Sequence, residues 1–463
     1  MTTRASRRKF LKACSMMSIA GAASPFALNL AAISAASATT SATYKAIVCL
    51  FLYGGNDHTN TLIPYDQASY DQYNASRPTL AIPRDAALTA NATGAVVSQG
   101  GHEFAFHPSL PAFKTHWDAG RLAVLANVGP LVVPTTRAQY QARSVKLPPN
   151  LFSHNDQQSV WQAQAPIGEG AKIGWGGRIG DLLMGQNTNT LFTCISATGN
   201  AVFLSGNNAL QYQVGSSGPV SISSISGSIY TSQGTTASAA YRTLITGTSP
   251  NLFENELDAI SGRSIGASQQ LIQNLPPAST FALPNPSSNL ASQLNTVARI
   301  ISVADQLGTN RQVFLVSLGG FDNHDFLLSQ HAQQLTQLNN AVNAFYGWLV
   351  QMNVQNQVTL FTASDFGRTL TSNGDGSDHG WGSHHFALGG AVQGKDVYGT
   401  FPPTTFFASG NPVDIGQGNM VPQIAVDQYA ATLARWMGVS DTDMPLVLPN
   451  IVNFTPRYVP FLL

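Results

Sequence analysis

The chain has 463 residues, of which 43% are hydrophobic and only 10% are charged, with 23 acidic and 23 basic residues. This length suffices for one large α/β domain with insertions or for two domains. Balanced charge without a basic patch interleaved with aromatic residues excludes nucleic acid as an expected partner.

The first 38 residues are expected to be an export signal. The basic segment at 6–12, with its paired Arg7 and Arg8, precedes an apolar stretch rich in alanine and serine. Such a pair is typical of twin-arginine signals, so we expect contact with the twin-arginine translocase and a periplasmic or secreted protein. Pro25 and Asn29 interrupt the apolar stretch, so no stable membrane span is expected after cleavage. Cleavage removes five of the 23 basic residues and no acidic residue, which leaves 18 basic and 23 acidic residues in the mature chain.

Four short apolar runs, each ending in a polar or glycine-rich turn, predict parallel strands covered on both faces. They span residues 45–52, 122–128, 312–318 and 357–362. Between the last two, apolar residues recur at helical spacing from 326 to 352. Strand, helix and strand of these lengths form a βαβ unit, so these two strands should run parallel and end at one edge of the sheet.

Residues 205–250 differ in character, being rich in Ser, Gly and Thr with a single charge at Arg242. We interpret them as a loop-rich insertion or cap, which can include short edge strands, within a domain at 39–463; disorder is the alternative for this segment. Residues 254–273 and 290–307 are expected to form helices.

Five of the ten histidines and five aspartates lie between Phe314 and His385. Open α/β sheets bind ligands at the carboxyl edge of their strands. Asp57, Asp322 and Asp365 are each the first acid after a predicted strand, so they should converge at that edge. A carboxylate and an imidazole on such a turn, as in Asp322 and His324, can hold a divalent cation rigidly.

A second histidine group, Asp378-His379 and His384-His385, flanks the flexible Gly380-Trp381-Gly382 and can bring imidazoles together; a nonspecific metal-binding surface loop is the alternative. His331 lies about two helical turns after His324 and either joins that edge or lies on the helix surface.

Arg368 follows Asp365 by three residues, and a guanidinium suits a phosphate or sulfate oxygen. An ion pair with Asp365 or Asp375 is the alternative. His107-Pro108-Ser109 and Ser153-His154 each put a hydroxyl near an imidazole, a nucleophile-and-base pattern that is also common by coincidence. The glycines before Asp57 lack the G-x-G-x-x-G spacing, so no dinucleotide cofactor is expected.

A set of motifs in fixed order resembles the exported bacterial family called domain of unknown function 1501. The motifs are Gly-Gly-Asn-Asp ending at Asp57, Ser153-His154, Gly174-Trp175-Gly176-Gly177-Arg178, Gly-Gly-Phe-Asp-x-His ending at His324, Ser-Asp-Phe-Gly-Arg-Thr from Ser364, Asp-His-Gly-Trp-Gly from Asp378, and Val426-Asp427-Gln428-Tyr429-Ala430. The resemblance runs from about residue 45 to the end. That family is similar to the alkaline phosphatase and sulfatase superfamily, which implies a doubly wound α/β fold, a mostly parallel sheet with helices on both faces, and hydrolysis of phosphate or sulfate esters.

The resemblance also implies a metal cluster that holds one or two Zn, Mn, Ca or Mg ions. Its ligands would be Asp57, Asp322, His324, Asp365, Asp378, His379 and His384. Thr59, Thr61 or Ser109 would attack the ester, or water at the metal would do so directly, while Arg368 would steady the anion. The chain departs from the superfamily pattern in the two-residue spacing of Asp322 and His324 and in having Phe366 where a histidine is usual.

The alternative function is a non-catalytic, metal-stabilised exported binding or assembly protein that uses residues 205–250 as its interaction surface. A metal-dependent oxidase or peptidase is disfavoured because neither H-E-x-x-H nor a flavin motif occurs.

Overall fold

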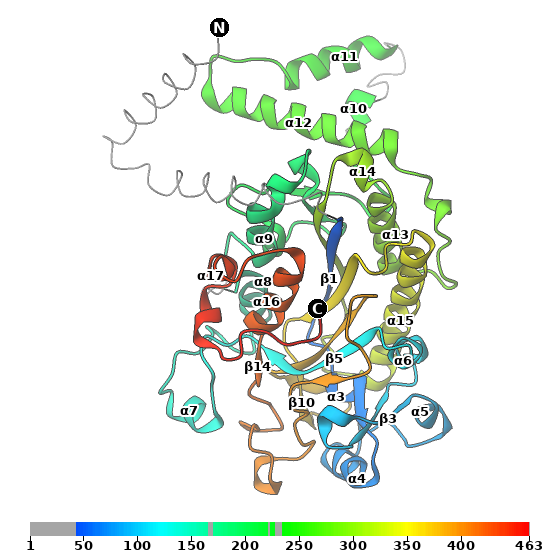
Figure 1. Ribbon diagram of the computed structural model, residues 1–463, viewed down its shortest axis with the longest axis vertical. Helices are drawn as coiled ribbons and strands as arrows, with labels where there is room; N and C mark the ends of the chain where they lie inside the picture. The colour runs from blue at the N-terminus through cyan, green and yellow to red at the C-terminus, as the bar shows by residue number, and fades with distance from the viewer. Residues whose placement is uncertain (1–42, 165–169, 221–222, 227–233, 463) are drawn as a thin grey trace.

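The computed structural model describes residues 43–164, 170–220, 223–226 and 234–462 (Figure 1). The expected export signal at 1–38 lies outside these ranges. Within them, no helix combines the length and apolar character needed to cross a bilayer.

The described chain is organised around a nine-stranded sheet of order β13-β5-β12-β9-β1-β8-β6-β7, with β14 also paired to β5. β1 pairs in parallel with both β8 and β9, and only β12 runs antiparallel to its neighbours β9 and β5. Its strands are β1 (Lys45–Leu52), β5 (Leu122–Gly129), β6 (Cys194–Ser196), β7 (Gln211–Gln213), β8 (Arg311–Leu318), β9 (Val358–Ser364), β12 (Ser383–Leu388), β13 (Val397–Tyr398) and β14 (Ile424–Ala425). Two small sheets combine β2 (Leu62–Pro64), β3 (Ala92–Ala95) and β4 (Glu103–Phe106), and β10 (Arg368–Ser372) with β11 (Ser377–His379).

Helices cover both faces of the main sheet because the side chains of its central strand alternate between two apolar cores. In β1, Val48 and Leu50 join the core formed with α13 and α15, whereas Ile47 and Phe51 join the core formed with α9 and α16. Figure 1 shows α13 and α15 on one side and α8, α9 and α16 on the other. The helices are α3 (His58–Thr61), α4 (Gln67–Ser76), α5 (Ala86–Ala90), α6 (Pro111–Asp118), α7 (Arg137–Ala142), α8 (His154–Ala163), α9 (Trp175–Leu183), α10 (Ser223–Ser226), α11 (Gly234–Ile245), α12 (Leu252–Asn274), α13 (Asn289–Ile301), α14 (Ala304–Leu307), α15 (Leu327–Gln351), α16 (Val426–Met437) and α17 (Met444–Val447).

The expected fold class is confirmed, with one refinement of topology. All four predicted strands form, and α15 connects β8 to β9 as expected. β8 and β9 are parallel but not adjacent, because β1 lies between them. The carboxyl ends of β1, β8 and β9 therefore meet at one edge.

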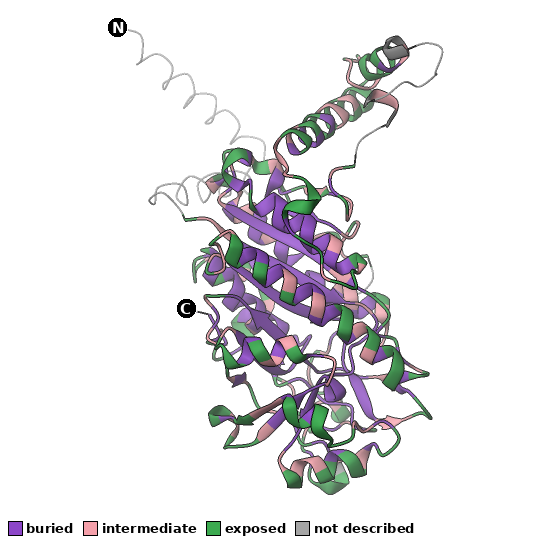
Figure 2. Ribbon diagram, turned by 90° about the vertical axis from the view of Figure 1, so that its right-hand side faces the viewer, coloured by how far each residue is buried: buried purple, intermediate pink, exposed green. Residues whose placement is uncertain are grey.

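The segment at 205–250 contributes an edge strand and α11, and the helix predicted at 254–273 forms as α12. β7 extends the main sheet at its β6 edge. Helices α11 and α12 form an arm that projects from the body, with the buried residues of α12 nearest the body (Figure 2). The predicted helix at 290–307 is divided into α13 and α14.

Candidate metal centre

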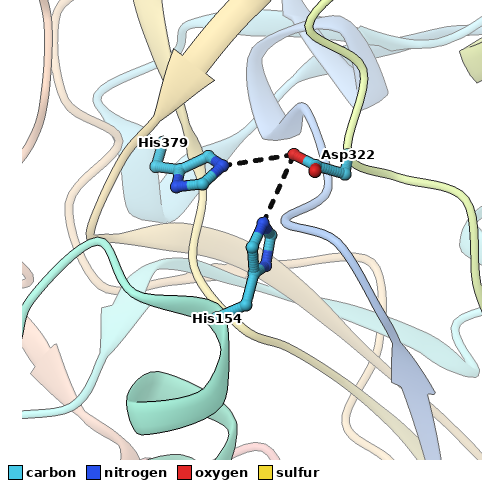
Figure 3. Close-up of side chains that lie close together, drawn as sticks. All are labelled: His154, Asp322 and His379. Carbon is cyan, nitrogen blue, oxygen red and sulfur yellow. Dashed lines mark hydrogen bonds and ion pairs between the residues drawn. The ribbon is translucent and has the colours of Figure 1, made fainter.

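Three side chains from distant parts of the chain converge beyond the carboxyl edge of the sheet (Figure 3). Asp322 follows β8, His379 ends β11, and His154 is the first residue of α8. Each offers one potential ligand atom, and the three atoms lie within 4.8 Å of one another.

A single carboxylate oxygen is the meeting point of the centre. Asp322 Oδ1 lies 3.4 Å from His154 Nε2, 3.2 Å from His379 Nε2 and 3.1 Å from His324 Nε2. The Nε2 atoms of His324 and His379 are themselves only 2.9 Å apart. Two lone-pair nitrogens cannot approach this closely without a proton or a cation between them.

The opposite nitrogen of each ring faces an acceptor. His379 Nδ1 donates to the carbonyl oxygen of Phe152 at 2.7 Å, and His154 Nδ1 donates to Asp365 Oδ2 at 2.6 Å. His324 Nδ1 lies 3.4 Å from Asp378 Oδ1. Protons held on Nδ1 leave the Nε2 lone pairs directed at the shared centre. This arrangement is typical of histidines that bind a metal through Nε2.

The chemistry of this donor set fits a divalent cation. Three imidazole nitrogens and one carboxylate oxygen suit zinc and related first-row ions better than magnesium or calcium, which prefer oxygen ligands. Burial lowers the pKa of His379 and so favours its neutral, metal-binding form. Asp322 remains a carboxylate because Arg368 and the nearby histidines outweigh the effect of burial and lower its pKa to about 2.

Arg368 holds the Asp322 carboxylate of the centre in place. Its side chain is fully buried, and it donates to the carbonyl oxygens of Gly54, Gly55 and Ser377 and to Asp322 Oδ1. These bonds tie the turn after β1 to the turn after β8. They also correct the expectation that Arg368 steadies a substrate anion. The guanidinium already donates to protein oxygens and is buried, so a substrate cannot reach it.

Glycine is required where these two turns touch. Gly54 has a φ of +115°, and a Cβ there would lie 2.3 Å from the backbone nitrogen of Asp322. The close approach places the β1 turn directly against the loop that carries Asp322.

Asp365 lies behind His154. The Asp365 carboxylate is fully buried, and its Oδ2 also accepts a hydrogen bond from Gln158 Nε2 at 2.8 Å. The bond to Asp365 raises the pKa of His154, against the effect of burial. The ring of Phe366 packs against His154 and His379, with centroids 4.8 and 4.6 Å apart. Asp365 therefore positions a ligand, which corrects the expectation that it is one.

Asp57 forms a buried ion pair with Arg77. Both of its oxygens accept hydrogen bonds from Arg77 at 2.9 Å, and both side chains are buried. Burial acts to raise the pKa of Asp57, but Arg77 and nearby histidines lower it overall. The structure thus corrects the expectation that Asp57 belongs to the metal cluster, because Asp57 pairs with Arg77 and is not among the described residues whose ligand atoms converge at the centre.

His384 also lies apart from the centre. It is buried, its Nδ1 accepts a hydrogen bond from the backbone nitrogen of Asn127, and its ring packs edge-on against His58 at 4.7 Å. Burial lowers the pKa of His384 well below its usual value. It is a core histidine rather than a fifth member of the cluster. His331 is likewise buried and lies 2.9 Å from Asn56 Oδ1, not on the helix surface.

The candidate nucleophiles are not brought to the centre. Thr59 and Thr61 are buried, and the Thr61 hydroxyl donates to the carbonyl oxygen of Asp57. Ser109 uses its backbone nitrogen to bond His107 Nδ1, and no contact joins its hydroxyl to Asp322. Within the described residues, the structure thus joins no hydroxyl of these three to the metal centre.

The sequence pattern missed His154 as a ligand. In the sequence, His154 stands out only as part of a Ser153-His154 pair, and the Ser153 hydroxyl donates instead to Asp156 Oδ2 at 2.8 Å. His154 follows a long loop rather than a strand, so the pattern of polar residues at strand ends does not include it. Its place among the ordered motifs was the available signal.

Comparison with known proteins finds a partial match to one family and several solved structures of similar fold. A profile of the family described as "Protein of unknown function (DUF1501)" matches residues 286–446. No curated protein matches the chain. The solved structures that it is similar to include a PsFucS1 sulfatase from Pseudoalteromonas sp., at 11% identity and a TM-score of 0.35 over 89% of this chain and 71% of that one. Another is the lipoteichoic acid synthase LtaP from Listeria monocytogenes, at 9% identity and a TM-score of 0.35 over 91% and 81%. A mutant of the alkaline phosphatase PafA matches at 11% identity and a TM-score of 0.27 over 72% and 64%.

Proposed function

We propose that this protein is an exported, metal-dependent hydrolase of phosphate or sulfate esters. The observation that carries the proposal is the convergence of three imidazole Nε2 atoms on one oxygen of Asp322, with the opposite nitrogen of each ring facing an acceptor. A divalent cation bound by these atoms would replace the protons that otherwise lie between the ring nitrogens and Asp322 Oδ1.

His154, His324, His379 and Asp322 would hold one divalent cation. When bound, such an ion polarises an ester oxygen and lowers the pKa of a water molecule. Asp365 and the carbonyl of Phe152 keep two of the imidazoles in the tautomer that binds through Nε2. Arg368 holds the Asp322 carboxylate in place.

Substrate access agrees with this role. Asp322 is 46% exposed and His324 is 40% exposed, so an ester group can reach the centre from solvent. Because Arg368 is buried, the bound cation itself would have to attract the phosphate or sulfate group.

Export through the twin-arginine translocase, followed by a periplasmic or secreted location, is part of the same proposal. It rests on the paired Arg7 and Arg8 and the stretch that follows them.

A second candidate is a non-catalytic, metal-stabilised exported protein. It is favoured by the burial of Thr59 and Thr61, which leaves the centre without either predicted hydroxyl nucleophile. The two candidates share the metal and differ only in turnover.

The test combines metal analysis with an ester panel. The purified protein is analysed by plasma mass spectrometry and assayed on aryl phosphates, phosphodiesters and sulfates. We expect bound metal and turnover, both lost in His379→Ala and both kept in His102→Ala, a control histidine whose side chain is 59% exposed and which bonds Asp66 instead. Metal without turnover would support the non-catalytic candidate, and absence of metal would remove the basis of both.

A further inference from the structure

The helical arm carries an unusual concentration of exposed apolar side chains. Leu252, Phe253, Leu257 and Ile260 of α12 are 78, 86, 62 and 45% exposed, and Leu244 of α11 is 73% exposed. Soluble proteins rarely leave such a patch uncovered unless it binds something.

These residues follow a coiled-coil spacing. Positions 253, 257, 260, 264, 267 and 271 alternate in steps of four and three along α12, which is the repeat of helices that pack against another helix. At the body end of this seam, Ala267 and Leu271 are buried and belong to the same core as Ile301. At the outer end, Phe253, Leu257 and Ile260 continue the seam without cover, although α11 packs beside α12.

We propose that two copies of this protein associate through the outer half of α12, with the two helices antiparallel. In this arrangement Leu257 of one copy lies opposite Ile260 of the second copy, and Phe253 lies opposite Ser264. The arm projects from the body (Figure 2), so an antiparallel pair places the second body beyond the tip of the arm.

The charges beside the seam fit this pairing. In an antiparallel pair with this register, Glu256 of each copy flanks Arg263 of the other, on both sides of the two-fold axis. Within one chain these two side chains already form an exposed ion pair of 3.1 Å, so both groups lie at the border of the seam. Three acidic residues near the outer end, Glu254, Glu256 and Asp258, disfavour an anionic lipid surface as the partner.

The exposed seam residues supply part of the area that a stable dimer buries. A stable interface buries roughly 800 Å² on each partner. A single aromatic side chain supplies roughly 150–250 Å². Phe253, Leu257 and Ile260 are 86, 62 and 45% exposed and supply part of this area from the seam itself, so the remainder must come from residues beside the seam.

The experiment is sedimentation equilibrium of the purified protein over a hundredfold range of concentration. We expect a monomer–dimer equilibrium whose Kd rises at least about 100-fold in Leu257→Glu, because two apolar contacts are lost in each dimer. Leu446→Glu is the matched control, since Leu446 is 57% exposed on the body, and it should leave Kd unchanged. Circular dichroism checks that both variants remain folded.

Charge exchange tests the register. Glu256→Arg alone should weaken the dimer, and the double variant Glu256→Arg with Arg263→Glu should restore it. A protein that stays monomeric throughout, or a dimer that Leu257→Glu leaves intact, overturns the proposal. A monomer that sediments with phosphatidylcholine vesicles, and loses this binding in Leu257→Glu, would assign the patch to a lipid surface instead and equally overturn it.

Discussion

Replacement of Asp365 by asparagine separates the positioning role of this carboxylate from the ligand role first expected of it. The change keeps the shape of the side chain and removes its charge. Asp365 is fully buried and accepts two short hydrogen bonds, from His154 at 2.6 Å and Gln158 at 2.8 Å. An asparagine oxygen can accept only weaker, uncharged bonds and no longer fixes the proton of His154 on Nδ1 as firmly.

The expected loss follows from that geometry. Removal of an outer carboxylate partner of a ligand histidine typically costs 10–100-fold in metal affinity. This range corresponds to about 1.4–2.8 kcal/mol, similar to one hydrogen bond to a charged group. Removal of a direct ligand would cost more, so His379→Ala should bind far less metal than Asp365→Asn.

The assay is competition for zinc with a chromophoric chelator, which gives Kd for wild type and variant. Asp378→Asn is the control: this carboxylate is 51% exposed and lies 3.4 Å from His324 Nδ1, a pair expected to contribute less than about 1 kcal/mol. If Asp365→Asn binds zinc as tightly as wild type, or if Asp378→Asn weakens binding more, the assigned positioning role is refuted.

Three further outcomes can be measured independently. Because folding raises the pKa of His154 from 6.5, protonated His154 stabilises the metal-free protein fully below pH 6.5. This contribution is lost as the pH rises through the pKa of His154 in the folded protein. Urea unfolding at a series of pH values measures the loss. Arg77→Met should lower the free energy of unfolding by about 3–5 kcal/mol, because Asp57 is left buried without its partner. The additional substitution Asp57→Asn should restore part of this loss, and urea unfolding of both variants measures the difference. Gly376→Ala should lower the free energy of unfolding by about 1–3 kcal/mol and weaken zinc binding, because the added Cβ would lie 2.1 Å from the carbonyl oxygen of His324. Gly319→Ala is the control in both assays, since a Cβ at Gly319 meets no atom within 4 Å.

The fold was predictable from the sequence because it depends on local patterns. Continuous apolar runs gave the central strands, and helical spacing gave α15 almost to the residue. The position of β1 between β8 and β9 was not predictable, since both strands pair with it through backbone hydrogen bonds that leave no trace in residue type.

The candidate site was predictable only in part. Asp322, His324 and His379 lie together as expected because strand ends and a glycine-rich loop bring them to one edge. The role of Asp57 depended on an arginine twenty residues later, and the role of Arg368 depended on its burial. Residue type shows that a group can bind metal or anion, but only the fold shows which partner already occupies it.

The connection between His154 and Asp365 has a consequence for how the protein acquires its metal. The two residues are 211 positions apart, and they meet only when α8 has packed onto the end of β9. An unfolded chain therefore lacks the assembled ligand set, and metal uptake reports that the long-range part of folding is complete. Metal retention would then serve as a check on the finished structure of each molecule, independent of any substrate.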